Sequence, residues 1–129
     1  MFNLAISLIL IHFLSDWIMQ PRWMAEQKSS NFGICSYHGL ITGLFLLLVY
    51  GINSMYGLKI NWVMALLAAG LYTITHILQD WFVWRIYKKY RDTKKEFQSD
   101  YWFYSTIAID QAVHLVLMFA LTSLAIEMS

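Results

Sequence analysis

The charged residues of this chain are confined to a few short segments, and the stretches between them are mostly apolar. Residues 1–15, 29–58, 60–79 and 101–109 contain no Asp, Glu, Lys or Arg. Of the 129 residues, 59% are hydrophobic and 13% are charged, against about 25% charged residues in a typical soluble domain. A small soluble domain needs a polar surface over most of its area. The sequence therefore excludes a small soluble enzyme and predicts an all-α, polytopic membrane protein.

Four apolar segments are long enough to cross a bilayer as helices, which takes about 20 residues. Helices are required because lipid cannot satisfy the open backbone groups of isolated strands. We expect a single four-helix transmembrane domain over residues 1–129, with spans at about 2–20, 36–56, 61–84 and 101–126. Pro21 favours an end to the first span. Cys35 is the one cysteine, which excludes an internal disulfide and a cysteine-cluster metal site.

The basic residues predict the orientation of these spans, because cytoplasmic loops are enriched in Lys and Arg. Eight of the nine lie in the first and third loops: Arg22, Lys28, Arg85, Lys88, Lys89, Arg91, Lys94 and Lys95. We therefore expect both loops to be cytoplasmic and both termini to lie outside the cytoplasm. The basic segment 85–100 is expected to extend the preceding helix, turn, and meet anionic lipid head groups. The net charge of +1 argues against a nucleic-acid partner.

Histidine and aspartate recur inside the apolar segments in a fixed pattern. Each expected span holds one histidine, and three of the four have an aspartate four residues away: His12/Asp16, His76/Asp80 and Asp110/His114, with His38 alone in the second span. That spacing places both side chains on one helix face. The order reverses in the fourth span, which runs in the opposite direction to the first and third. We therefore expect all seven groups in one layer in the cytoplasmic half of the membrane.

A weak internal repeat accompanies this pattern. The segment from His12 to Ile18 resembles the segment from His76 to Phe82, sharing His, Leu, Asp and Trp. Each copy is followed by a span with a further histidine, which favours a parallel repeat of two helix pairs with a site between them. Ile34 stands where the second half has Asp110, so the two half-sites would not be equivalent.

Ionisable groups inside a membrane are costly, so these residues either pair with one another or bind a ligand. Imidazole and carboxylate without thiolate favour Zn²⁺, with Mn²⁺ and Fe²⁺ as alternatives. Seven ligands fit two ions that share a carboxylate, or one ion with further Asp–His pairs behind it. Asp80 or Asp110 would act as general base. Gln20, four residues past Asp16, would orient a ligand or contact substrate. The competing interpretation is a hydrogen-bonded Asp–His network that only fixes helix packing.

A longer run of residues resembles a known family. The run His12-Phe-Leu-Ser-Asp16-Trp-Ile-Met-Gln20, followed by Trp23-Met-Ala-Glu26-Gln-Lys28-Ser29, resembles the opening signature of domain of unknown function 3307. His38, the His76/Asp80 pair and the pattern Asp110-Gln111-x2-His114 are also similar, so the resemblance covers nearly the whole chain. It implies a small bacterial or phage membrane protein, placed in the bacterial inner membrane, and no settled activity. It adds Glu26, Lys28 and Gln111 to Gln20 as candidate substrate-binding residues.

Three functions remain open at this stage. The leading hypothesis is an intramembrane metal-dependent hydrolase whose lipid-linked or membrane-proximal substrate enters from the cytoplasmic leaflet. The second is a divalent metal or proton transporter or channel, which with so few helices would form a homo-oligomer. The third is a non-enzymatic phage membrane factor with a structural Asp–His network. The lipid bilayer is a partner in all three.

Overall fold

The computed structural model describes residues 3–126. Its elements are α1 (Leu4–Phe13), the π-helix η1 (Leu14–Ile18), α2 (Arg22–Gln27), α3 (Phe32–Met55), α4 (Trp62–Thr93), the 3-10 helix η2 (Lys95–Gln98) and α5 (Asp100–Ala125). Over the described residues, strand-like pairing is limited to an isolated bridge between Ile60 and Ile126. The prediction of an all-helical chain is confirmed.

Asparagine starts three of the helices. The side chains of Asn3, Asn31 and Asn61 accept hydrogen bonds from the backbone N–H groups of Ala5, Ile34 and Met64 at the beginnings of α1, α3 and α4. An amide oxygen at this position satisfies a backbone donor that has no partner inside the helix. Past the end of α3, Gly57 has φ +92, a conformation that glycine adopts without steric cost. It turns the chain back toward α4.

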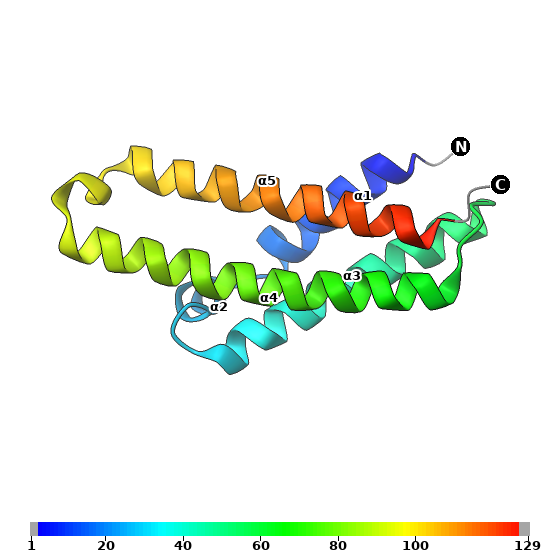
Figure 1. The fold of residues 1–129 in the computed structure, drawn as a ribbon, viewed down its shortest axis with the longest axis horizontal. Helices are drawn as coiled ribbons and strands as arrows, with labels where there is room; N and C mark the ends of the chain where they lie inside the picture. The colour runs from blue at the N-terminus through cyan, green and yellow to red at the C-terminus, as the bar shows by residue number, and fades with distance from the viewer. Residues whose placement is uncertain (1–2, 127–129) are drawn as a thin grey trace.

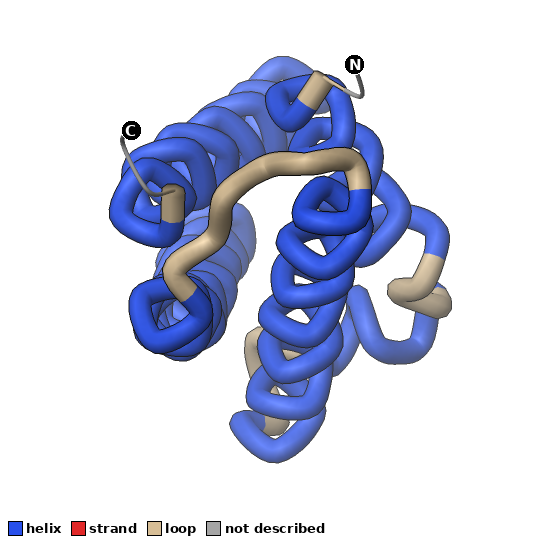
Figure 2. Tube along the Cα trace, turned by 90° about the vertical axis from the view of Figure 1, so that its right-hand side faces the viewer, coloured by secondary structure: helices blue, strands red, loops and turns tan. Residues whose placement is uncertain are grey.

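The long helices pack side by side. α4 and α5 form an antiparallel hairpin whose far ends extend past the other helices (Figure 1). α3 packs obliquely against α4, and α1 packs against α3 and α5. Both termini and the turn between α3 and α4 lie at one end of the bundle, which faces the viewer in Figure 2. The α4–α5 connection lies at the opposite end.

Two glycines allow α3 to approach α4 closely. A Cβ atom at Gly39 would overlap the side chain of Ile77, and one at Gly43 would overlap Thr73. Small residues four positions apart are a common way for membrane helices to bring their backbones together. This contact sets the distance between His38 on α3 and the face of α4 that carries His76 and Asp80.

The first expected span is shorter in the structure than the sequence predicted. Among the described residues, three helices are long and apolar enough to cross a membrane, Phe32–Met55, Trp62–Thr93 and Asp100–Ala125, and these indicate a multi-pass membrane protein. The span expected at 2–20 begins outside the described residues, and its helical run covers Leu4–Ile18 only. The helix ends there because the chain bends at Met19 and Gln20 and Pro21 adopts an extended conformation. At 1.5 Å per residue this run is roughly 20 Å long.

The other limits shift by a few residues. α3 begins four residues before the expected 36 because Asn31 caps it. The segment 85–100 is helical through Thr93 and then forms η2, which is the expected extension followed by a turn.

The distribution of side chains is inverted relative to a soluble bundle. Large apolar side chains such as Leu44, Val63 and Val116 are exposed on the outside, while His76, Asp80 and His114 are 0% exposed. Lipid is a suitable solvent for such an outer surface. The polar side chains are therefore concentrated in the middle of the bundle.

Candidate metal centre

One face of α4 supplies the centre of the site. Tyr72, His76, Asp80, Trp84 and Lys88 follow one another at a spacing of four residues, so they line a single stripe along the helix. The first three are almost completely buried, and the last two line an open pocket. The stripe leads from the apolar core, through the His/Asp cluster, to the basic end of the hairpin.

The first group of candidate ligands comes from three segments, η1, α3 and α4: Asp16, His38, His76 and Asp80. Nε2 of His38 lies 2.7 Å from Oδ1 of Asp16 and 3.5 Å from Oδ2 of Asp80. Nε2 of His76 lies 3.5 Å from each of the same two oxygens and 3.2 Å from Nε2 of His38. All four residues are buried, so these atoms face one another without access to lipid.

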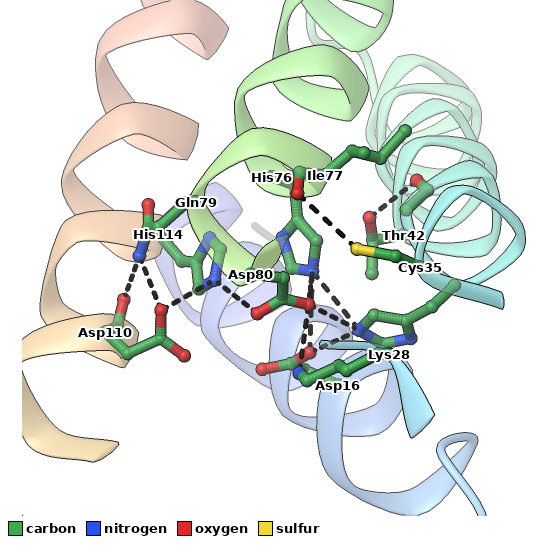
Figure 3. A network of polar contacts seen from close by, with 12 residues as sticks. Asp16, Lys28, Cys35, Thr42, His76, Ile77, Gln79, Asp80, Asp110 and His114 are labelled. Atoms are coloured by element: carbon green, nitrogen blue, oxygen red, sulfur yellow. Dashed lines mark hydrogen bonds and ion pairs between the residues drawn. The ribbon is translucent and has the colours of Figure 1, made fainter. Parts of the chain in front are cut away.

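The second group shares Asp80 with the first. Nε2 of His114 lies 3.5 Å from Oδ1 of Asp80 and 3.5 Å from Oδ1 of Asp110. Asp80 thus directs Oδ2 toward His38 and His76 and Oδ1 toward His114. Figure 3 shows Asp80 between Asp110 and His114 on one side and Asp16 and Lys28 on the other. The rings of His76 and His114 stack with their centroids 3.9 Å apart, which holds the two groups together.

Several of these buried atoms have no hydrogen-bond partner in the described part of the chain. They include Oδ1 of Asp80 and both ring nitrogens of His114. An unsatisfied buried polar group is costly, so it calls for an explanation. Ligands about 2 Å from a tetrahedral ion lie about 3.3 Å from one another. The separations of 3.2 and 3.5 Å fit that arrangement. The donor set and its spacing therefore could hold a metal ion.

His12 lies at the edge of the cluster and outside both groups. Its Nε2 lies 2.8 Å from Oε1 of Gln111, and its Nδ1 lies 3.1 Å from the hydroxyl of Tyr72. The cause is the π-helix η1, in which Met19 N–H bonds to the carbonyl of Leu14 five residues earlier. The wider turn rotates Asp16 away from the position it would have in a continuous α-helix with His12. Asp16 then faces His38.

Three neighbours hold the carboxylates in place. The amide nitrogen of Gln111 donates to Oδ2 of Asp16. Nε2 of Gln79 donates to Oδ1 of Asp110 at 2.9 Å, and the indole N–H of Trp84 donates to Oδ2 at 3.2 Å. Such partners orient a ligand and tune its basicity.

Lys28 lies inside the site. Its side chain follows α2 into the bundle, where Nζ donates to Oδ2 of Asp80 at 2.9 Å, and the residue is only 6% exposed. Burial disfavours the ammonium, but the carboxylates of Asp80 and Asp16 outweigh this effect and raise the pKa of Lys28. Gln20 lies beside it. In the amide orientation that satisfies both ends, its oxygen accepts from Lys28 and His38 at 3.2 Å each.

A pocket of about 570 Å³ opens next to the cluster. Its lining includes Asp16, Gln20, Lys28, Asp110 and Gln111 from the site, with aromatic and basic residues of α4 and α5 further out. Glu26 also lines it, and forms an exposed ion pair with Arg22 at 2.7 Å. The four candidate substrate-binding residues named from the sequence, Gln20, Glu26, Lys28 and Gln111, therefore all border one cavity.

Sequence reasoning did not identify three supporting residues: Tyr72, Gln79 and Trp84. Two of them could have been found, because Tyr72 and Trp84 extend the His76/Asp80 stripe by four residues in each direction. Gln79 reaches Asp110 on the neighbouring helix, and no spacing within α4 indicates that contact.

Comparison with known proteins agrees with the resemblance found in the sequence. No curated protein and no solved structure matches this chain. A family model described as "Protein of unknown function (DUF3307)" matches residues 4–129, essentially the whole chain. The chain therefore belongs to the DUF3307 family of proteins of unknown function.

Proposed function

We propose that this chain is an intramembrane metal-dependent hydrolase acting on a lipid-linked or membrane-proximal substrate from the cytoplasmic side. The observation that carries the proposal is the arrangement around Asp80. Its two oxygens face two groups of buried ligand atoms at metal-ligand spacing, and Oδ1 has no hydrogen-bond partner among the described residues. Zn²⁺ suits this donor set best, with Mn²⁺ and Fe²⁺ as alternatives.

The net charge of the buried side chains supports the binding of one or two divalent cations. The cluster contains three buried carboxylates, Asp16, Asp80 and Asp110, and one ammonium, that of Lys28. One divalent cation balances these groups when the histidines are neutral. A second cation, held through the shared Asp80, leaves an excess of positive charge that would attract an anionic substrate or hydroxide.

The two candidate catalytic aspartates differ in their position relative to the pocket, and we assign them different roles on that basis. A bound divalent ion would polarise a phosphoryl or acyl oxygen and activate water at neutral pH. Asp110 lines the pocket, so it is placed to accept a proton from that water, with Gln79 and Trp84 fixing its orientation. Asp80 does not line the pocket, so we assign it to metal binding alone. Gln20 borders both the pocket and the cluster and is assigned to substrate orientation.

We further propose that the segment Leu4–Ile18 completes a four-helix bundle in the bacterial inner membrane. Its outer face is apolar and exposed, as expected for contact with lipid, at Ile6, Leu10 and Phe13. The first and third loops carry most of the basic residues, which favours a cytoplasmic location for these loops and for the pocket beside them. Both termini would then lie outside the cytoplasm. A short helix is compatible with local thinning of the bilayer.

Transport of metal or protons has less support. A transporter needs polar groups along most of its path. Beyond His12 and Tyr72, toward the chain termini, the described core contains no further buried Asp, Glu, Lys, Arg or His. It is formed by apolar side chains such as Leu8, Leu46 and Met118, with a few uncharged polar ones such as Asn53 and Thr122. A purely structural network also has less support, because such a network would satisfy its own donors and acceptors.

The test is a product assay in vesicles. Protein loaded with Zn²⁺ or Mn²⁺ would be reconstituted with a bacterial lipid extract, and mass spectrometry would follow the release of polar products. We expect release that stops with chelator and falls by about a thousandfold in Asp110→Asn, the range expected for loss of a general base. Asp100→Asn, outside the pocket lining, is the control. Metal flux across the same vesicles without product release would support transport instead.

A further inference from the structure

The pocket beside the cluster differs in character from floor to rim. Its floor is polar and includes Asp16, Lys28 and Asp110. Its walls are apolar and aromatic, and its outer part carries two basic side chains of α4, Lys88 and Arg91. Polar residues at one end and aromatic walls along the sides suit a ligand that is itself amphipathic.

The basic end of the pocket is ordered by hydrogen bonds. Nζ of Lys88 donates to the backbone carbonyl of Glu26 and to the hydroxyl of Ser29, which ties α4 to α2. The guanidinium of Arg91 contacts Asp92 through Nε and Nη2. Neither Asp92 nor Ser29 lines the pocket. Arg91 is therefore paired with an acidic residue outside the pocket lining, whereas the described contacts of Lys88 include no carboxylate. Glu26, at the same end of the pocket, is paired with Arg22.

The cluster and the pocket carry an excess of positive charge once a metal is bound. One divalent cation and Lys28 balance the three buried carboxylates, so the ammonium of Lys88 is left without a carboxylate partner. A second divalent cation would add two more positive charges. A phosphate group carries one or two negative charges, and it accepts several hydrogen bonds from an arginine fork and an ammonium. It is the common biological anion that best matches this requirement.

The pocket also reaches the outer surface between η1 and α5. Trp17 and Phe103 line it, yet they are 51% and 40% exposed at the surface of the bundle. The indole N–H of Trp17 donates to Gln111 at 3.2 Å across this edge. An apolar chain could thus extend from the pocket into the bilayer while a polar head stays inside.

We propose that this pocket binds the phosphate-bearing head group of an amphiphile, with its apolar chain leaving between η1 and α5. The inference rests on the proposed function, because it names the substrate class of the same site. Lys88 and Arg91 hold the phosphate at the outer end of the pocket. The His/Asp cluster at its floor then faces the bond of the ligand that would be hydrolysed.

The test is lipid binding measured by native mass spectrometry in detergent. Phosphatidic acid would be titrated against phosphatidylcholine, with metal-loaded and with chelator-treated protein. We expect preferential binding of phosphatidic acid, and about a tenfold loss of affinity in Lys88→Gln/Arg91→Gln, equivalent to roughly 1.4 kcal/mol. Lys89→Gln/Lys95→Gln removes the same charge from exposed positions outside the pocket and should bind as the wild type does.

A second variant guards against loss of folding, because Lys88 also ties α4 to α2. Ile107→Trp fills the pocket from α5 and should block lipid while leaving metal content and thermal stability intact. Equal binding of the two lipids, or full binding by both pocket variants, would overturn the inference. If inorganic phosphate binds as tightly as the lipid, the ligand is free phosphate and the amphiphile assignment is wrong. Metal content is measured in every sample, so failure of the metal site is scored separately from failure of lipid binding.

Discussion

The ammonium of Lys28 lies 2.9 Å from Oδ2 of Asp80, with both side chains inside the bundle, although the two residues are 52 positions apart in the chain. Lys28 is therefore a counter-ion within the candidate metal centre. It compensates part of the negative charge of the three buried carboxylates Asp16, Asp80 and Asp110. Breaking a buried ion pair is strongly destabilising because it leaves one charge without compensation.

Lys28→Met should destabilise metal-free protein by about 3–5 kcal/mol, the usual cost of removing one partner of a buried pair. Saturating Zn²⁺ should restore much of that loss, because the cation replaces the missing positive charge. Thermal unfolding in detergent with and without metal measures both effects. Lys94→Met, at an exposed position, is the control. Equal destabilisation with and without metal would contradict the role of Lys28 as counter-ion.

The same pair should contribute equally across the neutral pH range. The pKa of Lys28 is raised in the folded protein. The stabilisation it provides is therefore complete below the unfolded pKa of about 10.4, and it is lost only as the pH rises through the higher folded value. The stability difference between wild type and Lys28→Met should be the same at about pH 6 and about pH 9 in chelator. A difference that shrinks across this range would mean that Lys28 titrates there.

Gln111→Leu should weaken metal binding without removing it. Gln111 joins Asp16 to His12 and Trp17 and orients the carboxylate. Loss of such a supporting partner costs about 10–100-fold in metal affinity. Competition with a chromophoric chelator measures the affinity, and Gln98→Leu at an exposed position is the control. An unchanged affinity would show that Asp16 is positioned by other contacts or is not a ligand.

The long apolar segments predicted the helical architecture, and the His/Asp spacing predicted that these side chains would lie close together. His76/Asp80 and Asp110/His114 lie on regular α-helices, so a spacing of four placed both residues of each pair on the buried face. The reversed order on α5 brought Asp110 to the level of Asp80. The spacing and the order of residues along each helix are sufficient to predict these two features.

Departures from regular helix and contacts between distant segments could not be predicted in the same way. The π-helix at Leu14–Ile18 separates His12 from Asp16, although their spacing equals that of the other pairs. Lys28 was expected in a cytoplasmic loop, as a candidate substrate-binding residue, whereas the turn after α2 carries it inward to Asp80. Both features depend on how α1, η1 and α2 pack around α4. The spacing of residues along one helix does not specify this packing.

Gly43→Val should separate α3 from α4 and weaken the first ligand group. The new side chain would overlap Thr73, so His38 would move away from His76 and Asp80. Overpacking of this kind costs about 1–3 kcal/mol. Thermal unfolding and metal titration measure the two effects. Gly51→Val is the matched control on the same helix, because nothing lies within 4 Å of a Cβ there. Equal effects at both positions would rule out close packing as the cause.

Single histidine variants should distinguish one ion from two. If Asp80 bridges two ions, His114→Ala should lose one equivalent of metal and keep the other, and His38→Ala should do the reverse. If one ion is bound, both variants should lower the same binding constant. Metal titration followed by calorimetry separates these outcomes. Two bound ions in both variants would exclude these histidines as ligands.

Quantification of bound metal is the most direct test of whether the His/Asp cluster binds metal. Wild-type protein, purified in mild detergent without chelators or nickel chromatography, would be compared with Asp80→Ala by plasma mass spectrometry. Asp92→Ala, at an exposed position outside the cluster, is the control. We expect about one or two equivalents of Zn, Mn or Fe in the wild type and the control, and loss of all bound metal in Asp80→Ala. Absence of metal from all three proteins, even after incubation with each ion, would exclude a metal centre and leave a hydrogen-bonded Asp–His network.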